Sequence, residues 1–342
     1  MKEWTELLAK RVRALLCGVL LLPAAALGQE DPAYGGHPGA EALIDEMVAK
    51  QGFEREDLQA LFADARRKDS ILKAISRPAE KTKPWHEYRA IFVTPTRTSQ
   101  GLEFYRRYHA SLLRAERQYG VPADIIVAII GVETRYGRNK GSYRVIDALS
   151  TLAFDYPPRS RFFSGELREY LLMTREQGLP VSELKGSYAG AMGYGQFIPS
   201  SYRAYAVDFD GDGVVDIINN PVDAIGSVAN YFRRHGWQTG EPVVATATVE
   251  PGYRQEWFND GLKPRRTVAE LATGKIRAEQ GPSERLATAM AFEGAEGEEF
   301  WLGWHNFYVI TRYNHSSMYA MAVYQLSQAI GAGLAKGADA PP

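Results

Sequence analysis

Cysteine is almost missing from this chain of 342 residues, in which Cys17 is the only one. A disulfide within the chain needs two cysteines, so no such bond can brace the fold, and a zinc site built from several cysteines is excluded with it. Histidine is scarce as well, with 6 in total and no HExxH pair, which gives a zinc protease no support. Neither a GxSxG nucleophile turn nor the glycine-rich phosphate loop of nucleotide-binding enzymes occurs.

An excess of charge of one sign is missing too. The chain has 40 Lys and Arg against 41 Asp and Glu, and its sequence pI is about 6.6. A protein that binds nucleic acid over a broad surface presents a positive field to the phosphates. We therefore expect no nucleic-acid partner. The composition, 45% hydrophobic and 24% charged, is that of a folded globular protein.

Long apolar runs are confined to the N-terminus. Basic residues at positions 10–13 precede an apolar stretch at 14–22, and small residues follow at 24–28. This order is typical of a secretory signal peptide over residues 1–28, so we expect an exported, periplasmic protein. Cys17 lies inside the segment to be removed. The bulky Leu16 before it is unlike the small residue of acylation signals, so lipid anchoring to the outer membrane is not expected.

The periodicity of apolar residues indicates a mainly α fold of the α+β type. Helices are predicted within 40–77 and over 99–118, 123–136, 145–154, 160–177, 220–236, 268–271 and 318–330, and strands over 243–249, 286–292 and 307–311. After a flexible leader at 29–39, the chain divides into a helical domain at 40–120, an α-rich core at 121–240, a small β-containing domain at 241–310, a C-terminal helix at 311–332 that returns to the core, and a tail at 333–342.

Glu133 is the candidate catalytic residue. It ends a run of apolar residues and shares a helix face with Ile125 and Ile129. Its neighbours three and four positions away on the helix carry no positive charge. Burial without a cation raises the pKa of a carboxyl group, as a general acid working near neutral pH requires. The residue pattern leaves open the alternative of a structural glutamate paired with Arg135 or Arg138.

A second candidate region, residues 186–202, interleaves four glycines with tyrosines and holds Gln196. Glycines permit a ligand to approach the backbone closely, and amide and hydroxyl groups can bind the hydroxyls of a sugar. Such a segment suits a carbohydrate. Further aromatic residues could stack on sugar faces, namely Tyr231, Trp237, Tyr313 and Tyr319. The alternatives are a tight turn between helices for the segment and core positions for the aromatic residues.

A third region resembles the first half of an EF-hand loop. Asp208, Asp210 and Asp212 occupy positions 1, 3 and 5, a glycine follows, and the backbone carbonyl of Val214 stands at position 7. Position 12 is an asparagine, so the remaining carboxylate ligand is expected to be Asp223, in a loop that runs over 208–223. We predict a structural Ca²⁺ site. The alternative is a turn rich in aspartate and glycine that binds no metal.

Four blocks of the sequence together resemble the lytic murein transglycosylase B family, glycoside hydrolase family 103: residues 131–137, 190–202, 220–237 and 312–317, in the family's order. The resemblance covers residues 40–332 and implies a lysozyme-like helical core within 121–240. It implies that Glu133 is the single catalytic acid and base. It also implies that the glycan cleft is lined by Ser187, Gln196, Tyr231, Tyr313, Asn314 and Tyr319, and that Arg159 contacts the stem peptide.

The same resemblance implies an enzyme that cleaves peptidoglycan glycan strands between N-acetylmuramic acid and N-acetylglucosamine without water, forming 1,6-anhydromuramoyl products. It implies no organic cofactor, a monomer, and cell-wall synthases as candidate protein partners. Ordinary glycosidases need two carboxylates, of which the resemblance supplies one. Two alternatives stay open: a hydrolytic muramidase in which Asp147 or Asp155 activates water, and a non-catalytic, Ca²⁺-stabilised protein that binds the cell wall.

Overall fold

The structure is a computed structural model that describes residues 31–76 and 83–338. The predicted signal peptide with Cys17 lies outside the described residues, as do the last four residues of the predicted tail. The leader predicted to be flexible at 29–39 is packed where it is described. Tyr34 is 2% exposed, its backbone N–H donates to Phe62 O at 3.1 Å, and its hydroxyl donates to Asp155. A large aromatic side chain with a polar tip explains why this short segment is held.

The first helices confirm the helical pattern predicted within 40–77. They are α1 (Pro38–Gln51), α2 (Arg55–Asp64) and α3 (Asp69–Ile75). α1 begins with a proline, its preceding residue His37 accepts a hydrogen bond from Gly39 N through its side chain, and Gly52 ends it in the left-handed conformation. Their apolar faces pack together and against the core helix α8 (Val145–Phe154).

The long helix predicted over 99–118 is instead two helices, α5 (Pro95–Arg107) and α6 (His109–Tyr119), preceded by α4 (Trp85–Phe92). The break lies at Tyr108, whose ψ of 23° leaves the helical range. α5 also begins earlier than predicted, because Thr94 accepts a hydrogen bond from Arg97 N and Pro95 occupies the first helical position. The apolar spacing continues across the break, so periodicity alone could not locate it.

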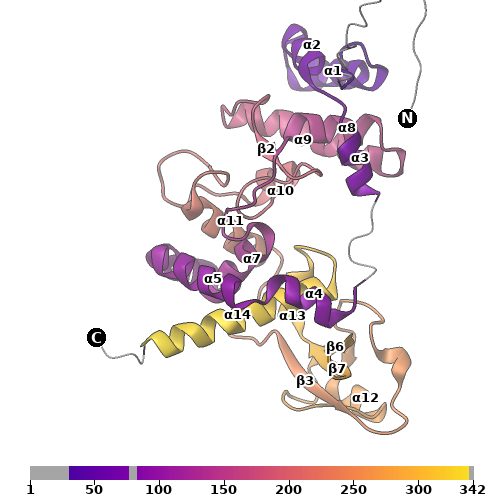
Figure 1. Cartoon of the computed structure of the whole chain (residues 1–342), viewed down its shortest axis with the longest axis vertical. Coiled ribbons are helices and arrows are strands. Elements are labelled where there is room, and N and C mark those ends of the chain that lie inside the picture. The colour runs from indigo at the N-terminus through magenta and orange to yellow at the C-terminus, as the bar shows by residue number, and fades with distance from the viewer. Residues whose placement is uncertain (1–30, 77–82, 339–342) are drawn as a thin grey trace, which may run out of the picture. The chain divides into compact units, whose positions relative to one another are not determined.

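The α-rich core consists of α7 (Ala123–Thr134), α8, α9 (Ser160–Glu176), α10 (Pro199–Tyr205) and α11 (Pro221–Arg234), with a short 3₁₀ turn η1 (Pro157–Arg159). α7 is buried on nearly every side, as its unbroken apolar run predicts. Two short strands, β1 (Tyr143–Arg144) and β2 (Lys185–Gly186), pair antiparallel and join the segment before α8 to the glycine-rich segment. Figure 1 shows α7 beside α5 and α14, and contacts between these helices agree.

The β-containing domain is a five-stranded antiparallel sheet in the order β4-β6-β7-β3-β5. Its elements are β3 (Val244–Val249), η2 (Gln255–Trp257), β4 (Arg266–Thr267), α12 (Val268–Thr273), β5 (Ile276–Ala278), β6 (Leu286–Glu293) and β7 (Glu298–Gly303). It has a small core of its own around Leu271, Ile276 and Leu302. The strands predicted at 243–249 and 286–292 and the helix at 268–271 are confirmed, whereas β7 was not predicted.

The strand predicted at 307–311 is wrong, because these residues belong to helix α13 (His305–Thr311). Five apolar or β-branched residues in a row fit a buried strand and a buried helix equally well by periodicity. Asn306, the second residue of α13, is fully buried and fixes the start of the helix through its side chain. It accepts a hydrogen bond from Gln238 N at 2.9 Å and donates to Gln238 O and Glu241 O, each at 2.8 Å.

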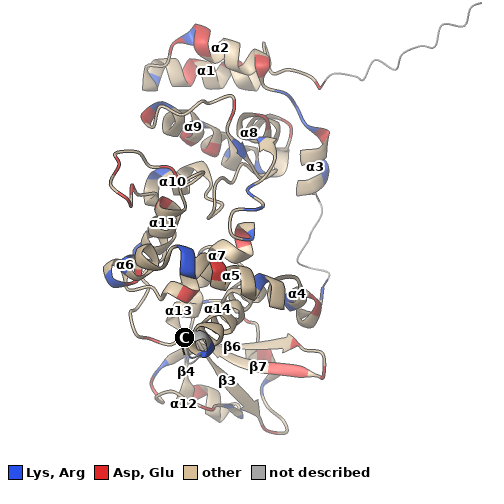
Figure 2. Ribbon diagram, turned by 60° about the vertical axis from the view of Figure 1, so that its left-hand side comes forward, with Lys and Arg blue, Asp and Glu red and all other residues tan. Residues whose placement is uncertain are grey.

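The chain closes with α14 (Ser317–Ala338), which packs against α7, α5, α4 and α13. The helix predicted over 318–330 is therefore present, packs on the core, and extends into the predicted tail. No helix within 31–76 or 83–338 is long and apolar enough to cross a membrane. Acidic and basic residues are distributed over many elements in Figure 2, and β7 is an acidic strand through Glu298 and Glu299. The fold class is mainly α with a small sheet, as predicted.

Candidate active site

Glu133 lies in the last turn of α7, and the backbone that follows it turns sharply. Arg135 and Tyr136 have φ angles of 52° and 61°, and Gly137 has 84°, so three residues in a row are left-handed. Arg135 N donates to Gly131 O at 3.1 Å and Tyr136 N to Ile130 O at 3.2 Å, which closes the helix end. Left-handed backbone at two non-glycine residues is uncommon and costs free energy, so the surroundings must hold it.

Arg97 and Tyr136 hold this turn from the side of α5. Arg97 Nη1 donates to Gly131 O at 2.6 Å, and the Tyr136 hydroxyl donates to Arg97 O at 2.9 Å. The ring of Tyr136 lies directly over Gly131, where an added Cβ would be 2.6 Å from the Tyr136 hydroxyl. Only glycine fits at that position, two residues before Glu133. No pattern in the sequence points to Arg97, because it lies far along the chain from Glu133, on another helix.

Thr134 ties the end of α7 to the glycine-rich segment. Its buried hydroxyl oxygen lies 2.9 Å from Tyr194 O and 3.1 Å from Ile130 O, either of which can accept its proton, and it accepts a hydrogen bond from Gly137 N at 3.0 Å. Glu133 therefore stands between two contacts that fix its helix end, one to α5 and one to residues 186–197. Thr134 is a second positioning residue that the sequence analysis did not single out.

The carboxyl group of Glu133 is half-buried and accepts a hydrogen bond of 2.5 Å from the hydroxyl of Tyr319 on α14. Burial raises the pKa of Glu133 from the ordinary value of 4.5 to about 7, and the hydrogen bond from Tyr319 opposes that rise. This direction agrees with the upward shift of the pKa that the sequence predicts. Arg135 and Arg138 do not pair with Glu133, because Arg135 donates to Gln100 at 2.8 Å and Arg138 lies 3.8 Å from Glu103.

Tyr319 and Tyr313 make the surroundings of Glu133 aromatic. Tyr319 is 3% exposed, and burial, followed by the nearby charge of Glu133, raises the pKa of its hydroxyl well above the ordinary value. Burial and the charge of Glu133 act on the pKa of Tyr313 in the same order. Both hydroxyls therefore stay protonated at any physiological pH, so they act as hydrogen-bond donors.

Tyr313 links this group to the other predicted residues. Its hydroxyl donates to Gly195 O, and its ring lies 4.7 Å from the ring of Tyr231. Tyr231 donates to Arg312 O at 2.5 Å and stacks on His235 at 4.0 Å. Tyr231 is 8% exposed, so it belongs to the packed wall of the group more than to its open surface. Trp237 is buried against Phe232. It is therefore a core residue, the alternative that the sequence left open for these aromatic residues.

Three glycines of the 186–202 segment lie closely against other protein atoms. A Cβ at Gly190 would lie 2.5 Å from Leu149, at Gly193 2.3 Å from Ile217 O, and at Gly195 2.8 Å from the Tyr313 hydroxyl. Protein atoms fill the space that a side chain would take at these three positions, so packing alone requires glycine there, and the close approach of a ligand stays a prediction. The segment is a tight turn, with backbone bridges from Met192 to Gly186 and to Phe197.

Ser187 and Gln196 shape this turn. The Ser187 Oγ accepts hydrogen bonds from Ala189 N at 3.3 Å and Ala191 N at 3.1 Å. Gln196 has a φ of 51° and donates through its amide to Gly193 O and Lys140 O, at 3.1 and 3.2 Å. The carbonyl oxygen of the Gln196 side chain remains an acceptor beyond these two donated bonds.

Two predicted residues have no part in these contacts. The exposed Asn314 follows Tyr313, and its backbone carbonyl accepts from Ser316 N at 2.7 Å. Arg159 lies in η1, exposed, with its guanidinium 4.4 Å from the ring centroid of Phe162. In the described part of the chain, no hydrogen bond or ring contact joins Arg159 to Glu133 or its tyrosines.

The two carboxylates considered for activating water are engaged elsewhere. Asp147 is 3% exposed, pairs with Arg144 at 2.7 Å and accepts from Arg66 N at 2.8 Å. Asp155 accepts from the Tyr34 hydroxyl and lies 3.6 Å from Arg67 Nε. Both therefore join the N-terminal helices to α8, which is a structural use of a carboxylate.

The EF-hand-like loop brings three of its predicted ligands together. One carboxylate oxygen from each of Asp208, Asp210 and Asp212 lies within 4.8 Å of the others. Asp208 accepts from Gly213 N at 2.8 Å and Gly211 N at 2.7 Å, and hydrogen bonds led by the one from Gly213 hold its pKa below the ordinary value. Hard, ionised oxygen donors of this kind fit Ca²⁺.

Asp223 does not join this group of three. It is fully buried at the start of α11 and accepts from Phe209 N at 2.7 Å and Asp216 N at 2.8 Å, one on each of its oxygens. Burial raises the pKa of Asp223, in contrast to Asp208. Val214, whose carbonyl is the predicted fourth ligand, donates its N–H to Asp212 at 2.8 Å within the same loop. Asp223 therefore ties both ends of the loop to α11.

Comparison with known proteins assigns the family. Residues 36–328 match the family model described as the transglycosylase SLT domain. The chain is 45% identical over 324 residues to membrane-bound lytic murein transglycosylase B of Escherichia coli strain K12, covering 92% of this chain and 88% of that protein.

Solved structures agree. The soluble lytic transglycosylase SltB1 from Pseudomonas aeruginosa superposes with a TM-score of 0.84 at 54% identity, covering 87% of this chain and all of the other. The Escherichia coli lytic transglycosylase Slt35, solved in complex with calcium, gives 0.82 at 44% identity, covering 92% and 99%. The relatives of this chain are enzymes that act on murein. The chain therefore belongs to the lytic transglycosylases of the SLT domain family, whose fold is lysozyme-like.

Proposed function

We propose that this lytic transglycosylase uses Glu133 as its only general acid and base, and cleaves the β-1,4 bond between N-acetylmuramic acid and N-acetylglucosamine in peptidoglycan. The observation that carries the proposal is the half-buried carboxyl group whose pKa burial raises to about 7. At that pKa a carboxyl group holds its proton in part of the population near neutral pH and can also take one back. The family to which the chain belongs supports the same substrate.

The reaction has two proton transfers. Glu133 first donates its proton to the glycosidic oxygen, so that the bond from this oxygen to C1 of the muramoyl residue breaks and N-acetylglucosamine leaves. The ionised Glu133 then takes the proton of the muramoyl C6 hydroxyl, and the C6 oxygen bonds to C1. The product is a 1,6-anhydromuramoyl end, no water is consumed, and Glu133 regains its proton. The substrate's own acetamido group helps to stabilise the positive charge that develops at C1.

Tyr319 adjusts the balance between the two steps. Its hydroxyl donates to Glu133 at 2.5 Å, and this bond strengthens when Glu133 becomes ionised. This hydrogen bond lowers the pKa of Glu133 and would by itself make Glu133 a poorer proton donor. Burial raises the pKa by more than the hydrogen bond lowers it. Tyr313 lies close enough to Glu133 for its charge to act on the tyrosine hydroxyl. We assign Tyr313, Gln196, Ser187, Tyr231, Asn314 and Arg159 to substrate binding.

A hydrolytic muramidase is the second candidate, and it needs another carboxylate to activate water. Asp147 and Asp155 are engaged with arginines, a backbone N–H and Tyr34, which argues against both. The products separate the two reactions, because transglycosylase products are lighter than hydrolysis products by one water. The third candidate, a non-catalytic protein that binds the cell wall, would release no products from peptidoglycan at all.

The loop at 208–223 is proposed to hold a structural Ca²⁺ ion through Asp208, Asp210, Asp212 and the carbonyl of Val214, with Asp223 fastening the loop to α11. Three close carboxylates repel one another unless a cation neutralises them. Bound calcium would supply that neutralisation and take no part in bond cleavage. We further propose that the protein works in the periplasm, as a monomer acting on glycan strands beside cell-wall synthases.

The test is Glu133→Gln against purified sacculi, with Glu103→Gln as the matched control. Glu103 is exposed and loses the same charge, but it lies outside the group around Glu133. We expect the unchanged chain and the control to release 1,6-anhydromuropeptides, measured by chromatography and mass spectrometry. Glu133→Gln should lower that release by about a thousandfold, within the range of general acid–base catalysis. Equal release by both variants would overturn the assignment, and water-containing products would favour the muramidase.

A further inference from the structure

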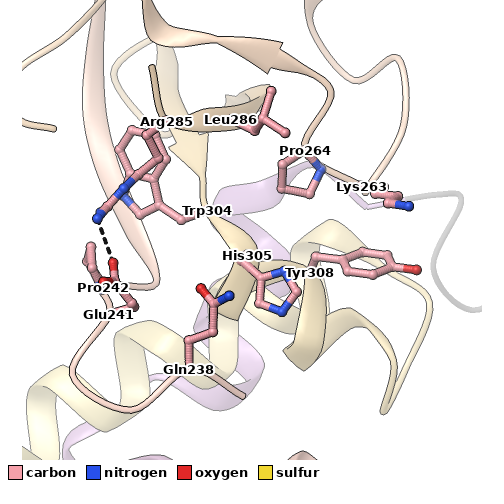
Figure 3. Close-up of a pocket in the computed structure, with 10 residues that line it drawn as sticks. All are labelled: Gln238, Glu241, Pro242, Lys263, Pro264, Arg285, Leu286, Trp304, His305 and Tyr308. Carbon is pink, nitrogen blue, oxygen red and sulfur yellow. Dashed lines mark hydrogen bonds and ion pairs between the residues drawn. The ribbon is translucent and has the colours of Figure 1, made fainter. Parts of the chain in front are cut away.

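A pocket of about 320 Å³ lies where β6 and the loop before it approach α13, and Figure 3 shows the side chains that line it. None of them belongs to the group around Glu133. We propose that this pocket binds a stem peptide of peptidoglycan through a free carboxylate, as an anchoring site separate from the catalytic centre. The source of the peptide rests on the proposed function, whereas the chemistry of the site rests on the pocket itself.

One wall of the pocket is preformed, because its side chains are already held by contacts within the protein. Arg285 pairs with Glu241 at 2.5 Å, and its guanidinium lies 5.4 Å from the ring centroid of Trp304. Asn306 holds residues 238–241 against α13 through its three hydrogen bonds to their backbone. A wall fixed in this way needs little reordering when a ligand binds, which lowers the entropic cost of binding.

Other side chains of the lining offer polar groups without partners. Within the described parts of the chain, the ammonium group of Lys263, the hydroxyl of Tyr308 and the side-chain amide of Gln238 make no hydrogen bond or ion pair. His305 donates from Nε2 to Gly236 O at 2.8 Å, which leaves its Nδ1 available. Figure 3 places Lys263 and Tyr308 together, across the opening from Trp304 and Arg285. A few polar groups that converge on a mostly apolar hollow are the usual form of a ligand site.

The charges select an anionic ligand. Glu241 neutralises Arg285, so Lys263 carries the uncompensated charge of the pocket. A carboxylate placed there gains a charge-assisted hydrogen bond. Leu286, which is 49% exposed, and the two proline side chains of the lining offer apolar surface for small groups such as the methyl of alanine. An acidic peptide with small side chains satisfies both parts of the site.

A sugar ring satisfies the site less well than a peptide. Sugars are held by stacking on an open aromatic face. Trp304 is 3% exposed and Arg285 lies over its ring, so that face is covered. The remaining polar groups, an amide, an imidazole nitrogen and a phenol, match the N–H and C=O groups of a peptide backbone. The other aromatic ring of the lining, that of Tyr308, has the guanidinium of Arg312 6.0 Å from its centroid. Because a cation lies over each ring, the pocket favours the peptide of peptidoglycan over its glycan.

The test is a calorimetric titration of the mature chain with the free tetrapeptide L-Ala-γ-D-Glu-meso-diaminopimelate-D-Ala. Lys263→Glu should weaken binding about tenfold or more, because it replaces an attraction by a repulsion. Arg265→Glu is the matched control, since it makes the same change of charge two residues away and does not line the pocket. We expect the control to bind as the unchanged chain does. Lys263→Ala repeats the test with a smaller change, and thermal melting confirms that each variant is folded.

A second arm uses sacculi and the inactive Glu133→Gln chain. The chain should sediment with intact sacculi more than with sacculi stripped of stem peptides by an amidase, and Lys263→Glu should remove that difference. No binding of the tetrapeptide, or equal affinity for Lys263→Glu and Arg265→Glu, would overturn the inference. Neither arm needs turnover. A chain that binds the peptide but releases no anhydro product therefore refutes the proposed function alone, and the reverse result refutes this inference alone.

Discussion

The chemistry is concentrated on the carboxyl group of Glu133 and the hydroxyl of Tyr319 that donates to it. Their separate influences on the pKa have opposite signs, since burial disfavours the ionised carboxylate and the hydrogen bond favours it. The sequence predicts the burial, because the apolar run before Glu133 is local. It could not predict which hydroxyl meets the acid, because Tyr319 lies on another helix and several tyrosines fit equally well.

Tyr319→Phe should move the pH dependence of the reaction. Removing the hydrogen bond takes away the only contribution that lowers the pKa, so the pKa of Glu133 rises above about 7. The basic limb of kcat/KM, where Glu133 loses its proton, therefore shifts to higher pH, and kcat falls because the ionised carboxylate loses a donor. The measurement is a pH profile of product release from sacculi.

Tyr324→Phe is the matched control for this experiment, since it removes a hydroxyl from the same helix. It should leave the profile unchanged. A basic limb that stays in place, or moves to lower pH, in Tyr319→Phe would show that the hydrogen bond does not set the pKa.

The end of α7 is the element on which positioning depends. Arg97, Tyr136 and Thr134 hold a left-handed turn that the backbone would not adopt unaided. The Gly131 position could be explained only after the fold was known, because the tyrosine ring that excludes a Cβ lies over it. The break at Tyr108 and the helix at 305–311 escaped prediction for the related reason that apolar spacing does not report backbone geometry.

Arg97→Ala should lower kcat more than it changes KM. The lost bond to Gly131 O frees the turn after Glu133, and a misplaced acid costs about tenfold or more in rate. Arg106→Ala, an exposed change on the same helix, is the control. Arg97→Lys, which keeps a donor, should recover part of the rate. Loss of affinity with kcat intact would contradict a positioning role.

The aspartate loop gives a prediction in which two of its acids behave differently. Asp208→Asn should abolish the rise in melting temperature on adding Ca²⁺. It should change the metal-free protein little, because the donors that it loses, Gly211 N and Gly213 N, lie on exposed residues where water can replace the carboxylate. Asp223→Asn should lower the melting temperature without calcium as well, since Asp223 bonds to backbone N–H groups at both ends of the loop. Thermal melts in chelator and in Ca²⁺ measure both effects. If both variants changed the melting temperature equally in chelator and in Ca²⁺, the separate roles of Asp208 and Asp223 would be contradicted.

Across the whole molecule, the site exists because segments far apart in the sequence return to α7. α14 brings Tyr319, the chain before it brings Tyr313, and α5 brings Arg97. The sequence predicts the mainly α fold, the β-containing domain and the returning C-terminal helix, because each leaves a local pattern. It does not predict the contacts among them, because these depend on tertiary packing that a pattern of spacing does not encode.

The stability of the molecule should depend on Glu133 through pH. Its pKa is raised from 4.5 in the unfolded chain to about 7 in the folded one, so the folded state binds the proton more tightly. The unchanged chain should therefore gain stability relative to Glu133→Gln as pH falls from 8 through 7 towards 4.5, by up to about 3 kcal/mol. Urea unfolding of both chains at pH 8 and pH 5 measures the difference. A gap that stays constant or reverses with pH would contradict the burial of this acid.

The most direct measurement is the titration of Glu133 itself. Glutamate labelled with ¹³C at the side-chain carboxyl gives one signal per residue, and the signal absent from Glu133→Gln is assigned to Glu133. The account predicts that this signal titrates with a pKa of about 7, well above the ordinary 4.5. A midpoint near 4.5 would mean that the carboxyl is ionised and solvated at neutral pH, and that it holds no proton to give to the leaving sugar.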